Sequence, residues 1–247
     1  VHPRTGDVYV CDAGEKQQIH VYDPTGRYRR SIGAPGGIYS THAGTRPGET
    51  HPLKFNHPTG IGFDAAGNLY VGCNQWEKHS ARWMCGGTEI KRIDANGSVA
   101  WERFCLEFVD CADVDPATDG VHVYTKLHHY VIDYGKPTGR QWTYRGFTLN
   151  RFAHPDDPRI PKGRPAGVIL RRVAGRRLMY LTSMNNNELF IFRFEPDTEF
   201  AVACGSFTVE DGRVVIWRDA DADGTRDEGE VSADGPVAGH GLCLAWS

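Results

Sequence analysis

Five carboxylates occupy alternate and then wider positions along residues 219–230, and their spacing suits a bound cation. They stand at positions 1, 3, 5, 9 and 12 of this stretch, around a glycine at position 6: Asp219, Asp221, Asp223, Asp227, Glu230 and Gly224. Ca²⁺ takes about six to eight oxygen ligands, and alternate carboxylates in a tight turn converge on one point. Without a cation, carboxylates this close would repel one another. The sequence therefore predicts a Ca²⁺ site in this stretch.

Each remaining ligand of the expected site has a defined role. Gly224 permits the sharp bend that brings the backbone carbonyl of Thr225 to the ion. Glu230 closes the shell with both oxygens, and Asp227 acts directly or through a water. A solvated acidic turn that binds no ion is the alternative.

The flanks of this stretch indicate what kind of site it is. The stretch resembles the calcium-binding loop of the EF-hand, but Arg226 stands where that loop normally has an aliphatic residue. Residues 214–217 read as a strand, and Gly235 with Pro236 excludes a long helix after the loop. The resemblance is thus to the EF-hand-like loops of extracellular repeat proteins. It implies a structural clamp instead of a calcium sensor.

The histidines and asparagines of the sequence do not have the spacing of a known metal-binding or catalytic motif. His128 and His129 are adjacent in an expected strand, so their side chains point to opposite faces and do not share an ion. His122 lies in another alternating strand, where packing is its expected role. Residues 185–187 are three asparagines between two strands, which is typical of a turn. The sequence has no nucleophile elbow, phosphate-binding loop or dinucleotide fingerprint.

Short β-strands are the elements expected to position these residues, because a block of alternating apolar residues repeats along the chain. Residues 6–10 (Gly-Asp-Val-Tyr-Val) resemble residues 67–71 (Gly-Asn-Leu-Tyr-Val), with weaker similarity at 120–124 and 177–181. An apolar strand precedes most of these blocks, and two further alternating runs follow. The unit is four short antiparallel strands, repeated about every 40 to 60 residues, which is typical of the blades of a β-propeller. The sequence therefore predicts an all-β propeller.

Residues 57–71 carry a family resemblance. Their sequence, His-Pro-Thr-Gly-Ile-Gly-Phe-Asp-Ala-Ala-Gly-Asn-Leu-Tyr-Val, resembles the NHL repeat. The resemblance is good over roughly the first 105 residues and degenerate afterwards. It implies that residues 1–247 form a single NHL-type β-propeller, six-bladed when complete, with residues 219–230 inserted between blades.

The chain is expected to be a fragment of that propeller, truncated at both ends. We expect about three full blades and two partial ones. A smaller ring, closed by pairing of the last strand beside the first, is the alternative.

The resemblance also suggests a second site, at the axis of the propeller. Lyases of the peptide-amidating type are similar to this family in fold and hold zinc there, and lactonases of the gluconolactonase type hold a divalent metal there. Aligning the first strands of the blades places Asp110 and His240 at equivalent positions, with Asp113 and His57 nearby. We expect these four residues either to hold a second divalent metal or to line a wet channel.

Composition limits which partners the protein is expected to bind and in which cellular compartment it is expected to lie. A formal charge of −3 gives no general attraction to nucleic acid, and no apolar run is long enough to span a membrane. Seven cysteines are many for a cytosolic chain. Cys73 could pair with Cys85, or Cys105 with Cys111, and buried free thiols are the alternative.

These features lead to two functional hypotheses. The first is a calcium-stabilised binding or scaffolding domain of an exported protein, extracellular or periplasmic, that recognises a protein, a glycan or a small molecule. The second is a metal-dependent lyase or lactonase-like hydrolase with its site at the propeller axis. In the enzyme, Asp110, Asp113 and His240 would converge on one ion that keeps an open coordination position.

Overall fold

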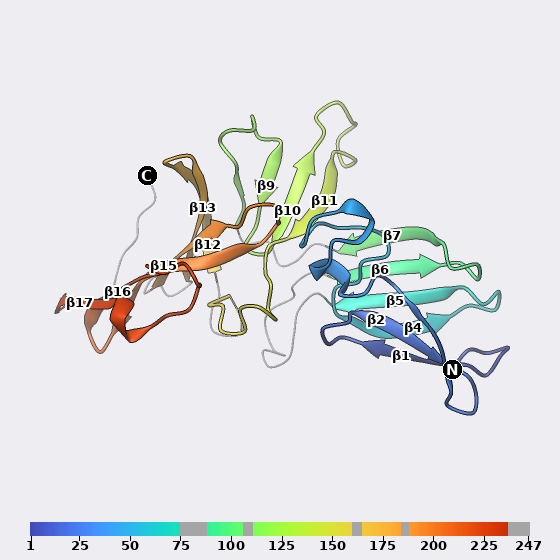
Figure 1. The fold of residues 1–247 in the computed structure, drawn as a ribbon. Coiled ribbons are helices and arrows are strands. Elements are labelled where there is room, and N and C mark those ends of the chain that lie inside the picture. Colours follow the sequence, from blue (N-terminus) through green and yellow to red (C-terminus); the bar gives the residue numbers. More distant parts are fainter. Residues whose placement is uncertain (75–87, 106–110, 160–164, 184–187, 237–247) are drawn as a thin grey trace. The chain divides into compact units, whose positions relative to one another are not determined.

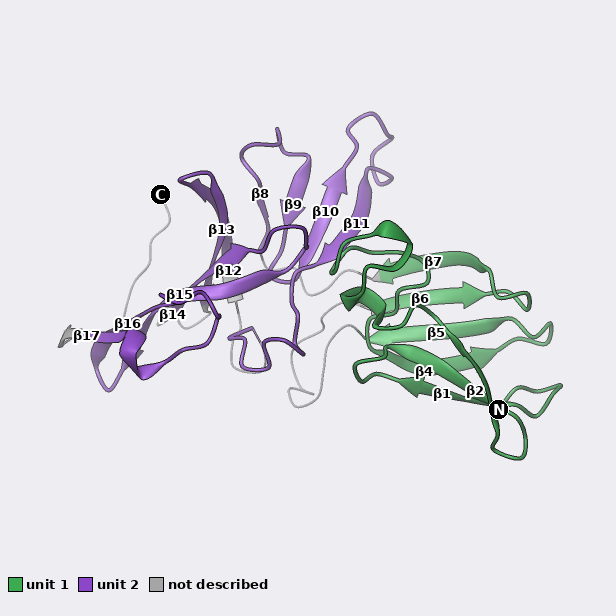
Figure 2. Ribbon diagram, in the orientation of Figure 1, with its two compact units in different colours: residues 1–108 green, residues 109–247 purple. Residues whose placement is uncertain are grey.

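The computed structural model describes residues 1–247 except 75–87, 106–110, 160–164, 184–187 and 237–247 (Figure 1). The described chain is all-β, with three short 3₁₀-helices and no α-helix among these residues. It divides into two compact units, Val1–Phe108 and Val109–Ser247, which are green and purple in Figure 2. Within the described ranges, no helix has the length and hydrophobicity needed to cross a membrane.

The first unit holds two antiparallel sheets whose strands pair in sequence order. A three-stranded sheet is followed by a four-stranded one. The strands of the first are β1 (Val8–Asp12), β2 (Gln18–Tyr22) and β3 (Tyr28–Ile32), and those of the second are β4 (Pro58–Phe63), β5 (Leu69–Asn74), β6 (Thr88–Ile93) and β7 (Val99–Cys105). The connection between the sheets carries η1 (Gly37–Tyr39) and η2 (His42–Gly44).

The turns of this unit follow from acids paired with glycines. At the turn between β4 and β5, the Gly67 N–H donates to the Asp64 carbonyl at 3.0 Å. Gly67 has a φ of +86°, which L-residues with a side chain rarely adopt. The Asp64 carboxylate accepts from the Asn68 N–H at 2.9 Å, which closes the hairpin at the predicted place. Alternate apolar residues then face one core: Ile19, Val21, Ile32, Phe55, Leu69, Val71, Cys73 and Ile93.

The second unit holds a four-stranded and a six-stranded antiparallel sheet, again paired in sequence order. The smaller sheet has β8 (Asp113–Val114), β9 (His122–Tyr124), β10 (His128–Ile132) and β11 (Trp142–Phe147). The larger has β12 (Pro165–Val173), β13 (Arg176–Ser183), β14 (Glu188–Phe194), β15 (Ala201–Glu210), β16 (Arg213–Arg218) and β17 (Val231–Pro236). Helix η3 (Glu228–Glu230) lies immediately before β17. Their shared core includes Tyr124, Leu170, Met179, Leu181, Phe192 and Trp217.

The predicted all-β, propeller-type fold is confirmed in its repeating element. Two of the sheets are four-stranded antiparallel meanders, in which each strand pairs with the next along the chain. The larger sheet of the second unit departs from that pattern, because β16 and β17 extend it to six strands. Residues 219–230 therefore connect two neighbouring strands of one sheet.

The cysteines favour one of the two alternatives left open by the sequence. Cys73 is a free thiol, so the disulfide suggested for it is not formed. Cys73 is fully buried in the core of the first unit, and burial raises the pKa of its thiol. A buried thiol of this kind behaves as a small apolar side chain.

Candidate metal centre

The acidic loop is held at both ends by strand pairing. It joins β16 to β17, and Trp217 lies opposite Val231 in the antiparallel ladder. Two residues in the loop have positive φ, Ala222 at +68° and Gly224 at +80°. A Cβ on Gly224 would lie 2.5 Å from the Val202 side chain, so only glycine fits this bend against the sheet. The sequence identified Gly224 as the bending residue, and the structure supports that role.

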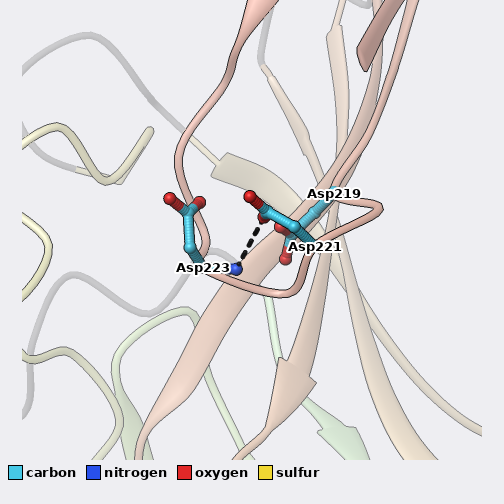
Figure 3. Close-up of side chains that lie close together, drawn as sticks. All are labelled: Asp219, Asp221 and Asp223. Atoms are coloured by element: carbon cyan, nitrogen blue, oxygen red, sulfur yellow. Dashed lines mark hydrogen bonds between the residues drawn. The ribbon is translucent and has the colours of Figure 1, made fainter. Parts of the chain in front are cut away.

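Three of the predicted ligands come together on this loop (Figure 3). One carboxylate oxygen from each of Asp219, Asp221 and Asp223 lies within 4.8 Å of the other two. Ca²⁺ binds oxygens at about 2.3–2.6 Å, so two ligands on opposite sides of an ion are about 5 Å apart. The observed separations are therefore compatible with one shared ion.

Backbone N–H groups hold each of these carboxylates in place. Asp219 accepts from the Gly224 N–H at 3.2 Å, and Asp221 accepts from the Asp223 N–H at 3.1 Å. Asp223 accepts from the Thr225 N–H at 2.6 Å. Each of these bonds engages a single oxygen, so the backbone leaves the second oxygen of each carboxylate for another partner.

Arg193 contacts the second carboxylate oxygen of Asp219. Its guanidinium on β14 forms an ion pair with Asp219, whose side chain is fully buried, and donates to the Ala222 carbonyl at 2.7 Å. Asp221 and Asp223 are exposed and have no cationic partner among the described residues. The loop thus keeps two uncompensated carboxylates beside the Asp219–Arg193 pair.

Glu230 closes the loop by hydrogen bonds to its beginning. One oxygen accepts from the Ala220 N–H at 2.6 Å, and the other accepts from the Trp217 indole at 2.9 Å. The indole bond and then the backbone bonds hold the pKa of Glu230 below its usual value, so it stays ionised. Asp227 occupies the N-cap position of η3 without a side-chain capping bond, and neither it nor Glu230 is part of the three-carboxylate cluster. The set that fits Ca²⁺ most directly is thus Asp219, Asp221 and Asp223.

The predicted axial residues are only partly covered by the structure. Asp110 and His240 lie outside the described residues. Asp113 already has structural partners, because its carboxylate accepts from the Val114 N–H at 2.9 Å and the Leu170 N–H at 2.7 Å. His57 belongs to the other compact unit, precedes β4 and has a φ of +58°. Asp113 therefore acts as a link between β8 and β12, and the axial site stays a prediction.

Sequence reasoning missed a buried histidine network in the second unit. The His129 Nδ1 lies 2.8 Å from the buried Glu199 carboxylate, and its Nε2 lies 2.7 Å from His122 Nδ1. His129 also stacks on Tyr124, with ring centroids 4.2 Å apart. His122 was expected to pack between strands, and its ring stacks on His129 with centroids 4.9 Å apart in addition to the hydrogen bond. Pairing of β9 with β10 brings His122 close to His129, whereas Glu199 is 70 residues from His129 and precedes β15. No local sequence pattern therefore indicates the network.

Comparisons with known proteins add only a fold-level likeness. No family model matches the chain, and no curated protein matches its sequence. Similar solved structures include a candidate gluconolactonase, with 13% identity over 87% of this chain and 68% of that chain and a TM-score of 0.25. A candidate 6-phosphogluconolactonase from Bacteroides fragilis has 11% identity over 99% of this chain and 73% of that chain, with a TM-score of 0.30.

Hydrazine synthase from Kuenenia stuttgartiensis is also similar. It shares 16% identity over 78% of this chain, with a TM-score of 0.28, and the chain spans 51% of its length. Identities and scores of this size transfer no activity. The function is therefore argued from the site itself.

Proposed function

We propose that this chain belongs to a calcium-stabilised β-propeller domain of the NHL type that serves in binding, with residues 219–230 as its EF-hand-like calcium loop. The observation that carries the proposal is the convergence of carboxylate oxygens from Asp219, Asp221 and Asp223 within 4.8 Å of one another. Carboxylates at this separation repel unless a cation lies between them. Arg193 compensates only Asp219, so a divalent ion supplies the missing charge.

The position of the loop supports a structural role for the ion. All predicted ligands come from one connection between two neighbouring antiparallel strands, β16 and β17. An ion bound there fixes the hairpin at the end of the sheet and the indole–carboxylate contact between Trp217 and Glu230. A catalytic metal instead keeps an open coordination position that faces a substrate. We therefore assign this Ca²⁺ to stability.

An exported location is part of the same proposal. Asp221 and Asp223 are exposed, so much of the ion's shell would remain in water. Extracellular calcium modules typically bind with dissociation constants of about 10⁻⁴–10⁻³ M, which suits such a loop. Cys11, Cys73 and Cys204 are free thiols and add no support for an exported location.

Calcium calorimetry with a matched pair of variants tests the proposal. Asp221→Asn with Asp223→Asn removes two ligand charges without touching the Asp219–Arg193 pair. The control is Asp211→Asn, in the turn between β15 and β16, where a positive φ of +49° also suits asparagine. The parent and the control should bind one Ca²⁺ and melt at higher temperature in millimolar CaCl₂. The double variant should lose both effects. A parent that neither binds nor gains stability overturns the proposal.

The enzyme alternative needs its own measurement. It depends on Asp110 and His240 together with Asp113, whose carboxylate already has partners in β8 and β12. Because the sequence resemblance includes the gluconolactonase type, the substrate to test is glucono-δ-lactone. Hydrolysis that requires zinc and is lost in His240→Ala would establish the enzyme. Absence of turnover in zinc- and calcium-loaded protein would remove the lactonase-like hydrolase from this alternative.

A further inference from the structure

A cavity of about 580 Å³ opens on one face of the six-stranded sheet. Its floor consists of two adjacent cross-strand rows, because alternate residues of a strand face the same side. Phe190, Ser206 and Trp217 lie opposite one another across β14, β15 and β16. Glu188 and Thr208 form the neighbouring row. Residues 153–158 form one wall, and residues 224–226 of the calcium loop form another.

The lining of this cavity carries unpaired negative charge. Four carboxylates line it: Asp156, Asp157, Glu188 and Glu210. Asp157 is paired with Arg159 at 2.7 Å, and Glu210 is paired with Arg226 at 2.8 Å. In the part of the chain that the structure describes, Asp156 and Glu188 have no cationic partner. Two carboxylates are thus left to attract a ligand.

Aromatic and hydroxyl groups complete the floor between those carboxylates. The Trp217 indole N–H is already used by Glu230, so its ring is fixed in position. Phe190 lies on the far side of Ser206 from Trp217 in the same row. The Ser206 hydroxyl makes no hydrogen bond within the described residues and lines the cavity. The floor therefore offers two aromatic rings and one open hydroxyl.

We infer that this cavity binds a small organic cation, meaning an amine or quaternary ammonium group attached to a short carbon chain. Such a ligand is attracted by Asp156 and Glu188, and its carbon atoms pack on Phe190 and Trp217, as aromatic rings favour cations. An anion would meet two unpaired carboxylates, and a neutral apolar ligand would desolvate them without compensation. A volume of about 580 Å³ lies in the usual range for small-ligand sites.

The inference rests on the proposed binding role and names its ligand class. The ammonium group could belong to a free small molecule or to a lysine side chain of a partner protein, which share this chemistry. Choline represents the first source, and Nα-acetyl-lysine N-methylamide represents the second. Each has a neutral counterpart of similar shape, 3,3-dimethylbutan-1-ol and Nα-acetyl-norleucine N-methylamide. Calorimetry or ligand-observed NMR on the full chain, in the presence of CaCl₂, gives the affinities.

At least one of the cations should bind about tenfold or more tightly than its neutral counterpart, because only the cation is attracted by the carboxylates and the aromatic rings. Glu188→Gln should weaken that binding by about tenfold, whereas Asp211→Asn outside the cavity should leave it unchanged. Asp156→Asn is a second test, because Asp156 is exposed and its replacement spares the fold. Equal binding of cations and neutral counterparts, or no effect of both carboxylate variants, would overturn the inference.

Calcium binding is measured on the same samples, so the two proposals fail separately. Ca²⁺ binding without cation binding would refute the cavity ligand and keep the calcium clamp. Cation binding without Ca²⁺ binding would refute the clamp and keep the ligand class.

Discussion

Replacing Lys91 by methionine should strongly destabilise the first unit, because this lysine is buried among groups that need a cation. Lys91 lies on β6 and is 1% exposed. Its ammonium group lies 2.6 Å from the buried Glu89 carboxylate and 3.4 Å from Glu102. It also donates to three backbone carbonyls of the segment before β4, those of His51, Pro52 and Lys54.

The expected loss of stability follows from the groups that lose their partner in Lys91→Met. The methionine side chain fills a volume similar to that of lysine, so the change creates little cavity. It leaves a buried carboxylate without its partner, which typically costs about 3–5 kcal/mol. Burial already raises the pKa of Glu89 to about 7. Removing the ammonium group raises that pKa further, so the penalty should be smaller at low pH, where Glu89 is protonated, and larger at high pH.

Urea unfolding of the parent, Lys91→Met and the double variant Lys91→Met with Glu89→Gln measures this effect. Hydrogen exchange of amides in β5 and β6 reports the sheet separately from the second unit. The double variant should recover a large part of the lost stability, because no buried charge remains. If Lys91→Met is as stable as the parent, or the double variant is no better than the single one, the reasoning about this ion pair is wrong.

Three further predictions address the loop, a second ion pair and pH. Gly224→Ala should cost about 1–3 kcal/mol in a thermal melt, because φ is +80° and the added Cβ would lie 2.5 Å from a neighbouring side chain. Gly229→Ala, which meets open space, is its control. Arg159→Leu should cost about 3–5 kcal/mol by leaving Asp157 buried and unpaired, and should speed proteolysis within residues 150–159. In the parent, the raised pKa of Glu89 means that this carboxylate binds a proton more tightly in the folded protein than in the unfolded chain. Its contribution to stability should therefore fall as pH rises from about 4.5 to about 7, and Glu89→Gln should flatten that part of the profile.

The sequence predicted those parts of the fold that local chemistry dictates. Alternating apolar residues place Leu69 and Val71 in the core, because strand side chains alternate between faces. An acid and a glycine at 64 and 67 predict the hairpin, because the glycine adopts the positive φ that this turn needs. The cluster of Asp219, Asp221 and Asp223 was predictable for the same reason, since the three residues lie within five positions of one another in the sequence.

Contacts between distant segments could not be predicted from one sequence. Lys91 meets the carbonyl of Pro52, which is 39 residues away, and Arg193 meets Asp219, which is 26 residues away. Those pairs depend on strand register and on the course of loops, which no local pattern encodes. Asp113 shows the same limit. Its place in a strand predicts an axial ligand, but no local pattern indicates that its carboxylate accepts the Leu170 N–H of the adjacent sheet.

In both units, a buried cationic side chain supplies hydrogen bonds to backbone carbonyls in the loops between short strands. Loops between such strands expose carbonyl groups that cannot all pair within a sheet, and a buried carbonyl without a donor is costly. A long basic side chain supplies several donors from one strand or loop. Lys91 donates to carbonyls within residues 51–54. Arg159 donates to the Ala201 carbonyl at 2.6 Å, and the Asp157 carboxylate compensates its positive charge. Because Arg159 anchors the segment that forms a wall of the cavity, that wall is fixed before any ligand arrives. A preformed wall lowers the entropy cost of binding, which is why a small cation can be bound there with few contacts.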